Sequence, residues 1–233
     1  MLTRKKDRLV LLGTAPSMVD APLSDETCEV WAVSAYAGHK PEMLQRVDAL
    51  FEMHLEHYWV TKLQDLKDFH GPVVMQQEHE QIPNSVEFPF EEAVAEYYIP
   101  AMGEDLYATN SVAYMLMLAG MMGYAEIALY GIHMSHHTEY GYQKPNCEYY
   151  LGWLAAKGCK IWLPDRGQLL RAPYLYGYNE PWREIAALRN DSARYEQEVA
   201  KYDAELEQLK EKRWRAEGRR EYARMIAHTK GAY

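Results

Sequence analysis

The chain has 233 residues, of which 48% are hydrophobic, and a formal net charge of −9. A chain of this length can bury roughly 70% of the surface that its unfolded form exposes, so its core needs no disulfide or metal. Three widely spaced cysteines argue against a disulfide framework or a zinc knuckle, and no apolar stretch has the length of a signal peptide or a membrane span. We therefore expect a protein of the reducing cytoplasm with no membrane partner.

The charge is unevenly spread along the chain. Residues 1–188 carry 14 Lys and Arg against 25 Asp and Glu, a net −11, whereas residues 189–233 carry 11 against 9, a net +2. An acidic body is a poor non-specific binder of nucleic acid. Nucleic acid is therefore expected only as a substrate.

The first predicted strand leads into a loop of small residues. Leu9–Leu12 is a continuous apolar run that stops at Gly13, as expected of a central parallel strand covered on both faces. Thr14, Ala15 and Ser17 have no bulk to keep a nucleotide phosphate from the backbone amides of this loop. The sequence therefore indicates a phosphate site here, with an ordinary turn as the alternative.

Further strands and helices alternate along the chain. An apolar helix is expected over Val112–Met122, capped by Asn110 or Ser111, and an amphipathic one over Cys147–Lys157. The alternation predicts an α/β, Rossmann-like fold with a mainly parallel sheet and helices on both faces. Residues 54–108 are expected to hold short helices and a mobile flap. The further strands are predicted at Val30–Val33, Ala49–Met53, Val73–Met75, Ile127–Tyr130 and Lys160–Leu163.

After Pro181 the composition becomes that of a coiled-coil-like helix. Five apolar residues there are spaced by 4, 3, 4 and 3 positions: Tyr195, Val199, Tyr202, Leu206 and Leu209. This spacing indicates about two heptads. Their apolar residues would pack either against a second copy of the chain, in a homo-oligomer, or against the domain of the same chain. We expect a nucleotide-binding domain over residues 1–180 and a helical extension over residues 181–233.

A loop dense in protonatable groups follows the strand predicted at Ile127–Tyr130. Doubly wound sheets place their active sites at such carboxyl strand ends. The loop can supply a general base, or hydroxyls that neutralise a departing phosphate; the alternative is that its side chains are solvated surface groups. The candidates are His133, His136, His137, Glu139, Tyr140 and Tyr142.

Two other predicted strands end in polar residues. Ser34 ends one, and Glu52 and His54 stand at the end of the next. Because the carboxyl ends of parallel strands share one edge of the sheet, these groups are expected to converge there. The histidines of the loop match no standard zinc spacing, so no metal site is predicted.

Four segments carry a family resemblance: Leu11–Ser17, Val30–Ser34, Tyr107–Tyr114 and Gly123–Ile132. They resemble the family 42 bacterial sialyltransferases and their relatives, the motility-accessory-factor glycosyltransferases and the 6-hydroxymethylpterin pyrophosphokinase-like proteins. In the sialyltransferases a Gly-Asn-Gly-Pro-Ser loop holds the nucleotide, and a Thr-Ser-Gly turn precedes a long apolar helix. The whole chain also resembles proteins commonly encoded by tailed phages.

The resemblance implies a nucleotide-sugar donor, CMP- or UDP-linked, in a GT-A-like enzyme without an obligatory metal. Tyr140 and Tyr142 match a family tyrosine that stabilises the leaving phosphate. No residue aligns with the family's catalytic histidine, which leaves His133, His136 or His137 as the base. The residues that would contact the nucleotide are Gly13, Thr14, Ala15, Pro16, Ser17, Ser34, Thr109, Asn110 and Ser111.

These observations together predict a nucleotide-sugar-dependent glycosyltransferase. Its acceptor would be a hydroxylated DNA base or a glycan, in the host cytoplasm if a phage encodes it. One alternative is a Mg²⁺-dependent pyrophosphoryl or phosphoryl transferase, for which Asp20 and Glu52 are the nearby acidic ligands. Another is a non-catalytic nucleotide-binding or assembly protein, and fold alone does not choose among the three.

Overall fold

The computed structural model describes residues 2–36, 44–103, 105–134, 140–165, 167–172, 174–178 and 182–230. The chain divides into two compact units, Met1–Arg171 and Ala172–Tyr233. The expected boundary between residues 180 and 181 lies in the segment that separates the last strand from the long C-terminal helix.

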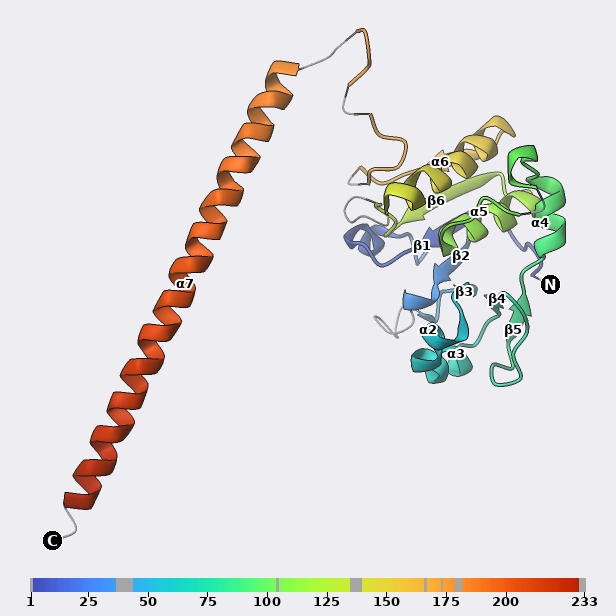
Figure 1. Cartoon of the computed structure of the whole chain (residues 1–233). Helices are drawn as coiled ribbons and strands as arrows, with labels where there is room; N and C mark the ends of the chain where they lie inside the picture. Colours follow the sequence, from blue (N-terminus) through green and yellow to red (C-terminus); the bar gives the residue numbers. More distant parts are fainter. Residues whose placement is uncertain are drawn as a thin grey trace. The chain divides into compact units, whose positions relative to one another are not determined.

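The first unit is built on a seven-stranded parallel sheet in the order β5-β4-β3-β2-β1-β6-β7 (Figure 1). This confirms the predicted fold class. Strands β2 to β5 extend from one side of β1, and the chain then returns to place β6 on the other side. The strands are β1 (Arg8–Leu12), β2 (Cys28–Val33), β3 (Ala49–Glu52), β4 (Val73–Met75), β5 (Ser85–Glu87), β6 (Glu126–Tyr130) and β7 (Lys160–Trp162).

Helices cover both faces of this sheet, which explains the continuous apolar runs of its strands. In β1, Leu9 and Leu11 pack into one hydrophobic cluster, while Val10 and Leu12 pack into a second cluster on the other face. Helices α4, α5 and α6 contribute to the first cluster, and α2 and α3 to the second. The helices are α2 (Glu56–Trp59), α3 (Leu63–Asp68), α4 (Phe90–Glu96), α5 (Ser111–Met121) and α6 (Tyr140–Ala156).

Helix α5 begins and ends within one residue of the predicted Val112–Met122. The side chain of Asn110 accepts a hydrogen bond from the backbone amide of Ala113, so Asn110 rather than Ser111 is the N-cap. Gly123, with φ of +71°, follows the C-terminus in a left-handed conformation that suits glycine.

Helix α6 begins seven residues before the predicted start at Cys147, so the predicted start was wrong. Gly141 and Pro145 are poor helix formers, which favoured a loop. In the structure the first turn is tied to the segment before α5, because Tyr142 and Gln143 accept hydrogen bonds through their carbonyl oxygens. Tertiary contacts therefore override local propensity.

Residues 54–108 contain the expected short helices and also strand β5, which was not predicted. Ser85–Glu87 is only three residues long and none of its residues is fully buried. A short edge strand of this kind has no continuous apolar run to reveal it. The flap expected in this interval stays a prediction.

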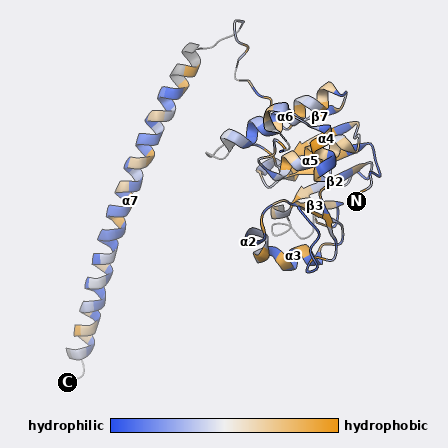
Figure 2. Ribbon diagram, turned by 45° about the vertical axis from the view of Figure 1, so that its right-hand side comes forward, coloured by the Kyte–Doolittle hydropathy of each residue, from blue (hydrophilic) through white to orange (hydrophobic). Residues whose placement is uncertain are grey.

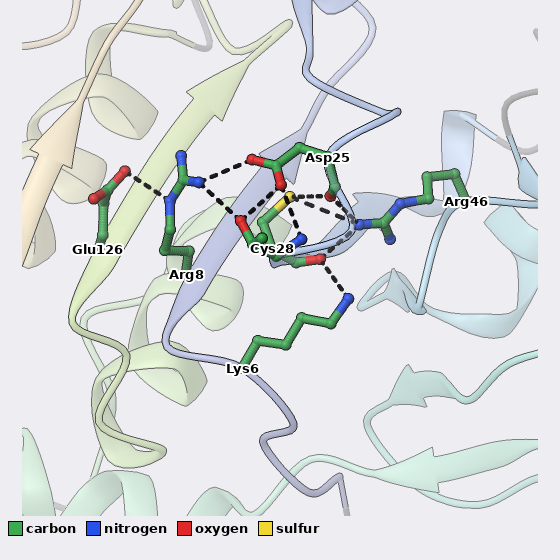
Figure 3. A network of polar contacts seen from close by, with 7 residues as sticks. Lys6, Arg8, Asp25, Cys28, Arg46 and Glu126 are labelled. Carbon is green, nitrogen blue, oxygen red and sulfur yellow. Dashed lines mark hydrogen bonds and ion pairs between the residues drawn. The ribbon is translucent and has the colours of Figure 1, made fainter.

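A network of charged residues joins the amino ends of β1, β2 and β6 (Figure 3). Arg8 pairs with Asp25 at 2.8 Å and with Glu126 at 3.1 Å. Arg46 donates to the carbonyl oxygens of Asp25 and Cys28. These cations hold the sheet together at the edge opposite the carboxyl strand ends.

The second unit contains one helix of 49 residues, α7 (Trp182–Lys230), as the sequence predicts. Its hydropathy is mixed along its length, with apolar residues spaced among many charged ones (Figure 2). Within the described part of the chain, no helix is both long enough and apolar enough to cross a membrane.

Candidate functional site

A pocket of about 1190 Å³ opens at the carboxyl ends of β1, β2, β3 and β6. The strand order reverses at β1, and such a switch point is where open α/β sheets bind ligands. The ends of the strands and the loops after them supply Gly13–Pro16, Val33–Ala35, Met53, His54 and Gly131–Met134. Helices α2, α5 and α6 and the segment before α5 supply Tyr58, Ala108–Val112, Tyr114, Tyr142 and Gln143.

The loops after β1 and β6 are packed backbone against backbone. Gly13 donates to the carbonyl oxygen of Tyr130 at 2.8 Å, and Ala15 donates to that of Gly131 at 2.9 Å. A Cβ atom at Gly13 would lie 2.3 Å from the Gly131 oxygen, and one at Gly131 would lie 2.3 Å from the Gly13 oxygen. Gly13 is therefore required by the contact between the two loops, and a larger side chain would displace them whether or not a ligand binds.

Ser17 lies beneath the pocket rather than in its lining. Its buried hydroxyl accepts from the Gly131 amide at 2.8 Å and lies 2.6 Å from Nε2 of His133. Ser17 thus holds His133, whose Nε2 is engaged, in the pocket wall. This arrangement suits a positioning role for Ser17 more than direct contact with a ligand.

Glu52 is a fully buried carboxylate at the end of β3, and it binds the residues around it. One oxygen accepts from the Ser34 hydroxyl at 2.5 Å and lies 3.8 Å from the ammonium of Lys62. The other accepts from the backbone amide of His54 and contacts its ring Nδ1. The carboxylate therefore fixes the orientation of His54 and leaves Nε2 as the ring nitrogen that can act on a ligand.

This contact shifts the pKa values of both partners. Burial raises the pKa of the Glu52 carboxyl, but hydrogen bonds from His54 and Ser34 outweigh burial, and the pKa lies below its ordinary value. The hydrogen bond to Glu52 raises the pKa of His54 above its ordinary value. His54 is thereby a stronger base than a solvated histidine.

We expect the His54 imidazole to titrate above pH 6.5 in NMR spectra, and its midpoint to fall in a Glu52→Gln variant. The pKa of His54 in the folded protein is raised. The contribution of His54 to folding stability is therefore present below about pH 6.5 and is lost as the pH rises through that raised pKa. The pKa of Glu52 in the folded protein is lowered. The contribution of Glu52 to folding stability is therefore present above about pH 4.5 and is lost as the pH falls through that lowered pKa. An unchanged His54 midpoint in Glu52→Gln would contradict the pairing.

The start of α5 is held by a buried amide on α6 that the sequence did not reveal. The Asn146 side-chain oxygen accepts from the Thr109 amide at 2.9 Å, the Thr109 hydroxyl at 3.0 Å and the Asn110 amide group at 3.2 Å. Its nitrogen donates to the carbonyl oxygen of Tyr107. Thr109 and Asn110 line the pocket, yet both side chains are engaged in this structure, whereas Ser111 opens the helix.

The N-termini of two helices meet at the pocket. The first turns of α5 and α6 both contribute to the lining, and half-exposed Tyr142 stands on the first turn of α6. Unpaired amides at helix N-termini attract anions. Among the described lining residues none is Asp, Glu, Lys or Arg, although the protein as a whole is acidic. The site therefore suits an anion held by neutral donors and histidine.

The remaining predicted residues are only partly covered by the structure. His136, His137 and Glu139 lie outside the described residues, as does the side chain of Tyr140. Asp20 ends a short helical turn, Pro16–Asp20, and is not among the lining residues. Within the described part, no three His, Cys, Asp or Glu residues are grouped so that they could hold a metal ion.

Fold and pocket together define a Rossmann-like α/β protein with a pocket at the switch point of its sheet, where such sheets bind ligands. No protein-family model and no curated protein sequence matches the chain. Among solved structures, the chain is similar to the sialyltransferase CstII from Campylobacter jejuni, at 14% sequence identity.

The matches to the complexes of that enzyme with cytidine-5'-monophosphate and with CMP-3FNeuAc each cover 72% of this chain and 88% of that chain, at a TM-score of 0.47. The match to an Asn→Ala variant of that enzyme in complex with CMP covers 73% of this chain and 90% of that chain, at a TM-score of 0.46.

Proposed function

We propose that the protein is a glycosyltransferase that uses a nucleotide sugar, CMP- or UDP-linked, as donor. The observation that carries this proposal is the composition of the pocket. Two helix N-termini and the Thr14 amide of the small-residue loop stand at the pocket as donors for a phosphate, while a carboxylate-held histidine stands at the adjacent strand end. Resemblance of the Leu11–Ser17 and Tyr107–Tyr114 segments to the family 42 sialyltransferases also supports it.

The nucleotide phosphate would lie against the Gly13–Pro16 loop and the start of α5. The donors would be the Thr14 amide and the amides of Ser111 and Val112 in the first turn of α5. These amides are fixed before the ligand arrives, so they would stabilise developing charge without reorganisation. Tyr142, on the first turn of α6, would donate its hydroxyl to the leaving phosphate oxygen. The base of the nucleotide would occupy the part of the pocket near Thr109 and Asn110.

The chemical step is a displacement at the anomeric carbon of the donor. Nε2 of His54 takes the proton of the acceptor hydroxyl, whose oxygen forms the new bond to the anomeric carbon. The bond from that carbon to the phosphate oxygen breaks, and its electron pair leaves with the nucleotide. In this step Glu52 stabilises the imidazolium that forms, as a carboxylate does for a catalytic histidine.

We assign the base to His54 rather than to His133 because of their partners. Nε2 of His133 is engaged by the buried Ser17 hydroxyl, whereas Nδ1 of His54 is engaged by a carboxylate that raises its pKa. The acceptor stays open between a hydroxylated DNA base and a glycan, and the protein would act in the cytoplasm, that of the host if a phage encodes it.

The test begins with thermal unfolding of the full chain in the presence of CMP, UMP, UDP and the corresponding nucleotide sugars, each with Mg²⁺ and with EDTA. A ligand at a hundred times its Kd stabilises by about 2.7 kcal/mol, which is a readily measured rise in Tm. We then expect free nucleotide to be released from the nucleotide sugar that raises the Tm most. Equal release in EDTA is expected, since no step of the proposal passes through a metal.

Each other outcome rejects the proposal in a different way. A nucleotide that binds without any release from its sugar, with water or candidate acceptors, would make this a non-catalytic binding protein. Transfer of a phosphoryl or pyrophosphoryl group that stops in EDTA would make it a Mg²⁺-dependent kinase-like enzyme. If no nucleotide raises the Tm, a nucleotide sugar is not the donor.

A further inference from the structure

Helix α7 carries a row of apolar residues along its N-terminal half, interrupted at Ser192. We call this row the seam, and each of its side chains is 51–67% exposed: Leu188, Tyr195, Val199, Tyr202, Leu206 and Leu209. Their spacing is that of a and d positions in a heptad repeat, over about three heptads. An isolated helix stabilised by its own ion pairs, such as Arg213 with Glu217 at 3.0 Å, has no need of such a seam.

The two halves of α7 have opposite charge. Residues 182–209 hold four Lys and Arg against seven Asp and Glu, a net −3, whereas residues 210–230 hold eight against three, a net +5. A helix of this kind complements a second copy of itself only when the two run in opposite directions.

We propose that α7 forms an antiparallel coiled coil with α7 of a second copy of this chain. The two-fold axis lies between Tyr202 and Leu206, so that Tyr202 packs against the partner's Leu206 and Val199 against the partner's Leu209. Each of these layers occurs twice, so Val199, Tyr202, Leu206 and Leu209 of one helix are covered by the same four residues of the other. Tyr195 then faces the partner's Arg213, whose guanidinium suits the face of an aromatic ring.

This register places opposite charges on both flanks of the seam. Glu196 lies beside the partner's Lys210, Glu198 beside the partner's Lys212, and Arg189 beside the partner's Glu217. Every one of these pairs is repeated by symmetry. Asp203 and Glu205, at the axis, meet only their own copies, so favourable contacts outnumber unfavourable ones by three to one.

The parallel arrangement is less favourable because it aligns like charges. There Glu196 would flank the partner's Asp191, and Glu198 would flank the partner's Asp203. Some pairs, such as Glu205 with the partner's Lys210 and Lys212 with the partner's Glu217, remain attractive. The orientation is therefore decided by the positions of Glu196 and Lys210.

The test is light scattering of the full chain as a function of concentration. We expect a dimer whose Kd rises about tenfold in Glu196→Lys, since two attractive contacts become repulsive, and which is restored in Glu196→Lys/Lys210→Glu. Glu211→Lys makes the same charge change away from the seam and should leave the Kd unchanged. Leu206→Lys puts a charge into the central layers and should give a monomer with the Tm of the α/β unit preserved.

Three outcomes would overturn the proposal. A monomer at all concentrations means that the seam is covered by something other than a second copy. A dimer that tightens in Glu196→Lys runs parallel, because the substitution then relieves repulsion with the partner's Asp191. A dimer that persists in Leu206→Lys is formed through another surface.

Discussion

Replacing His54 with glutamine should reduce release of nucleotide from the donor by about 10²- to 10⁴-fold, the usual cost of losing a general base. Glutamine keeps the size and polarity of the side chain but cannot take a proton. Donor affinity, measured by calorimetry, should change far less than turnover, because proton removal belongs to the transition state. Wild-type turnover in His54→Gln would exclude His54 as the base.

His57→Gln is the matched control, since it removes a second imidazole three residues away that is not among the lining residues. It should leave turnover unchanged. Glu52→Gln keeps the shape of the buried side chain but removes its charge, so it should lower turnover by an intermediate factor. His133→Gln tests the rival assignment, and a loss there larger than in His54→Gln would transfer the role of base to His133.

Replacing Asn146 with alanine should lower the free energy of unfolding by about 2–4 kcal/mol. The substitution removes an acceptor used by three donors and a donor used by the Tyr107 carbonyl oxygen, all within or next to the buried start of α5. Urea unfolding followed by circular dichroism measures the change. Nucleotide binding should weaken as well, because the Thr109 and Asn110 wall of the pocket loses its anchor.

Gln64→Ala provides the comparison for this measurement. Gln64 is also an amide on a helix, but it bonds only Asp68 within the same exposed turn. Its replacement should change the free energy of unfolding by no more than about 0.5 kcal/mol. An equal, small effect of both substitutions would show that the Asn146 contacts contribute little.

The fold was predictable where a strand is buried on both faces. Leu9–Leu12 and Val73–Met75 are unbroken apolar runs because helices cover both sides of the sheet, and such runs are visible without any structure. β5 lacks that signal because it lies at the edge of the sheet and is partly exposed.

Part of the candidate site could also be located from sequence, since parallel strands bring their ends to one edge. That reasoning predicted that Ser34, Glu52 and His54 converge, and in the structure Glu52 contacts both of the others. It could not rank His54 above His133, because the ranking depends on which ring nitrogen each buried partner engages. Asn146 gave no signal, since its partners lie 36–39 residues away along the chain.

The backbone contact between Gly13 and Gly131 has a consequence for how the pocket accommodates a ligand. Neither loop can shift without the other, since their main chains already touch and each is bonded to the end of a central strand. This side of the pocket therefore acts as a rigid platform. The opposite wall is built differently, from single turns after β2 and β3 that carry Ser34 and Tyr58, and there Ser34 is held through its side chain by Glu52. In the proposed enzyme the phosphate would therefore rest against main chain, and the group attached to it would meet side chains.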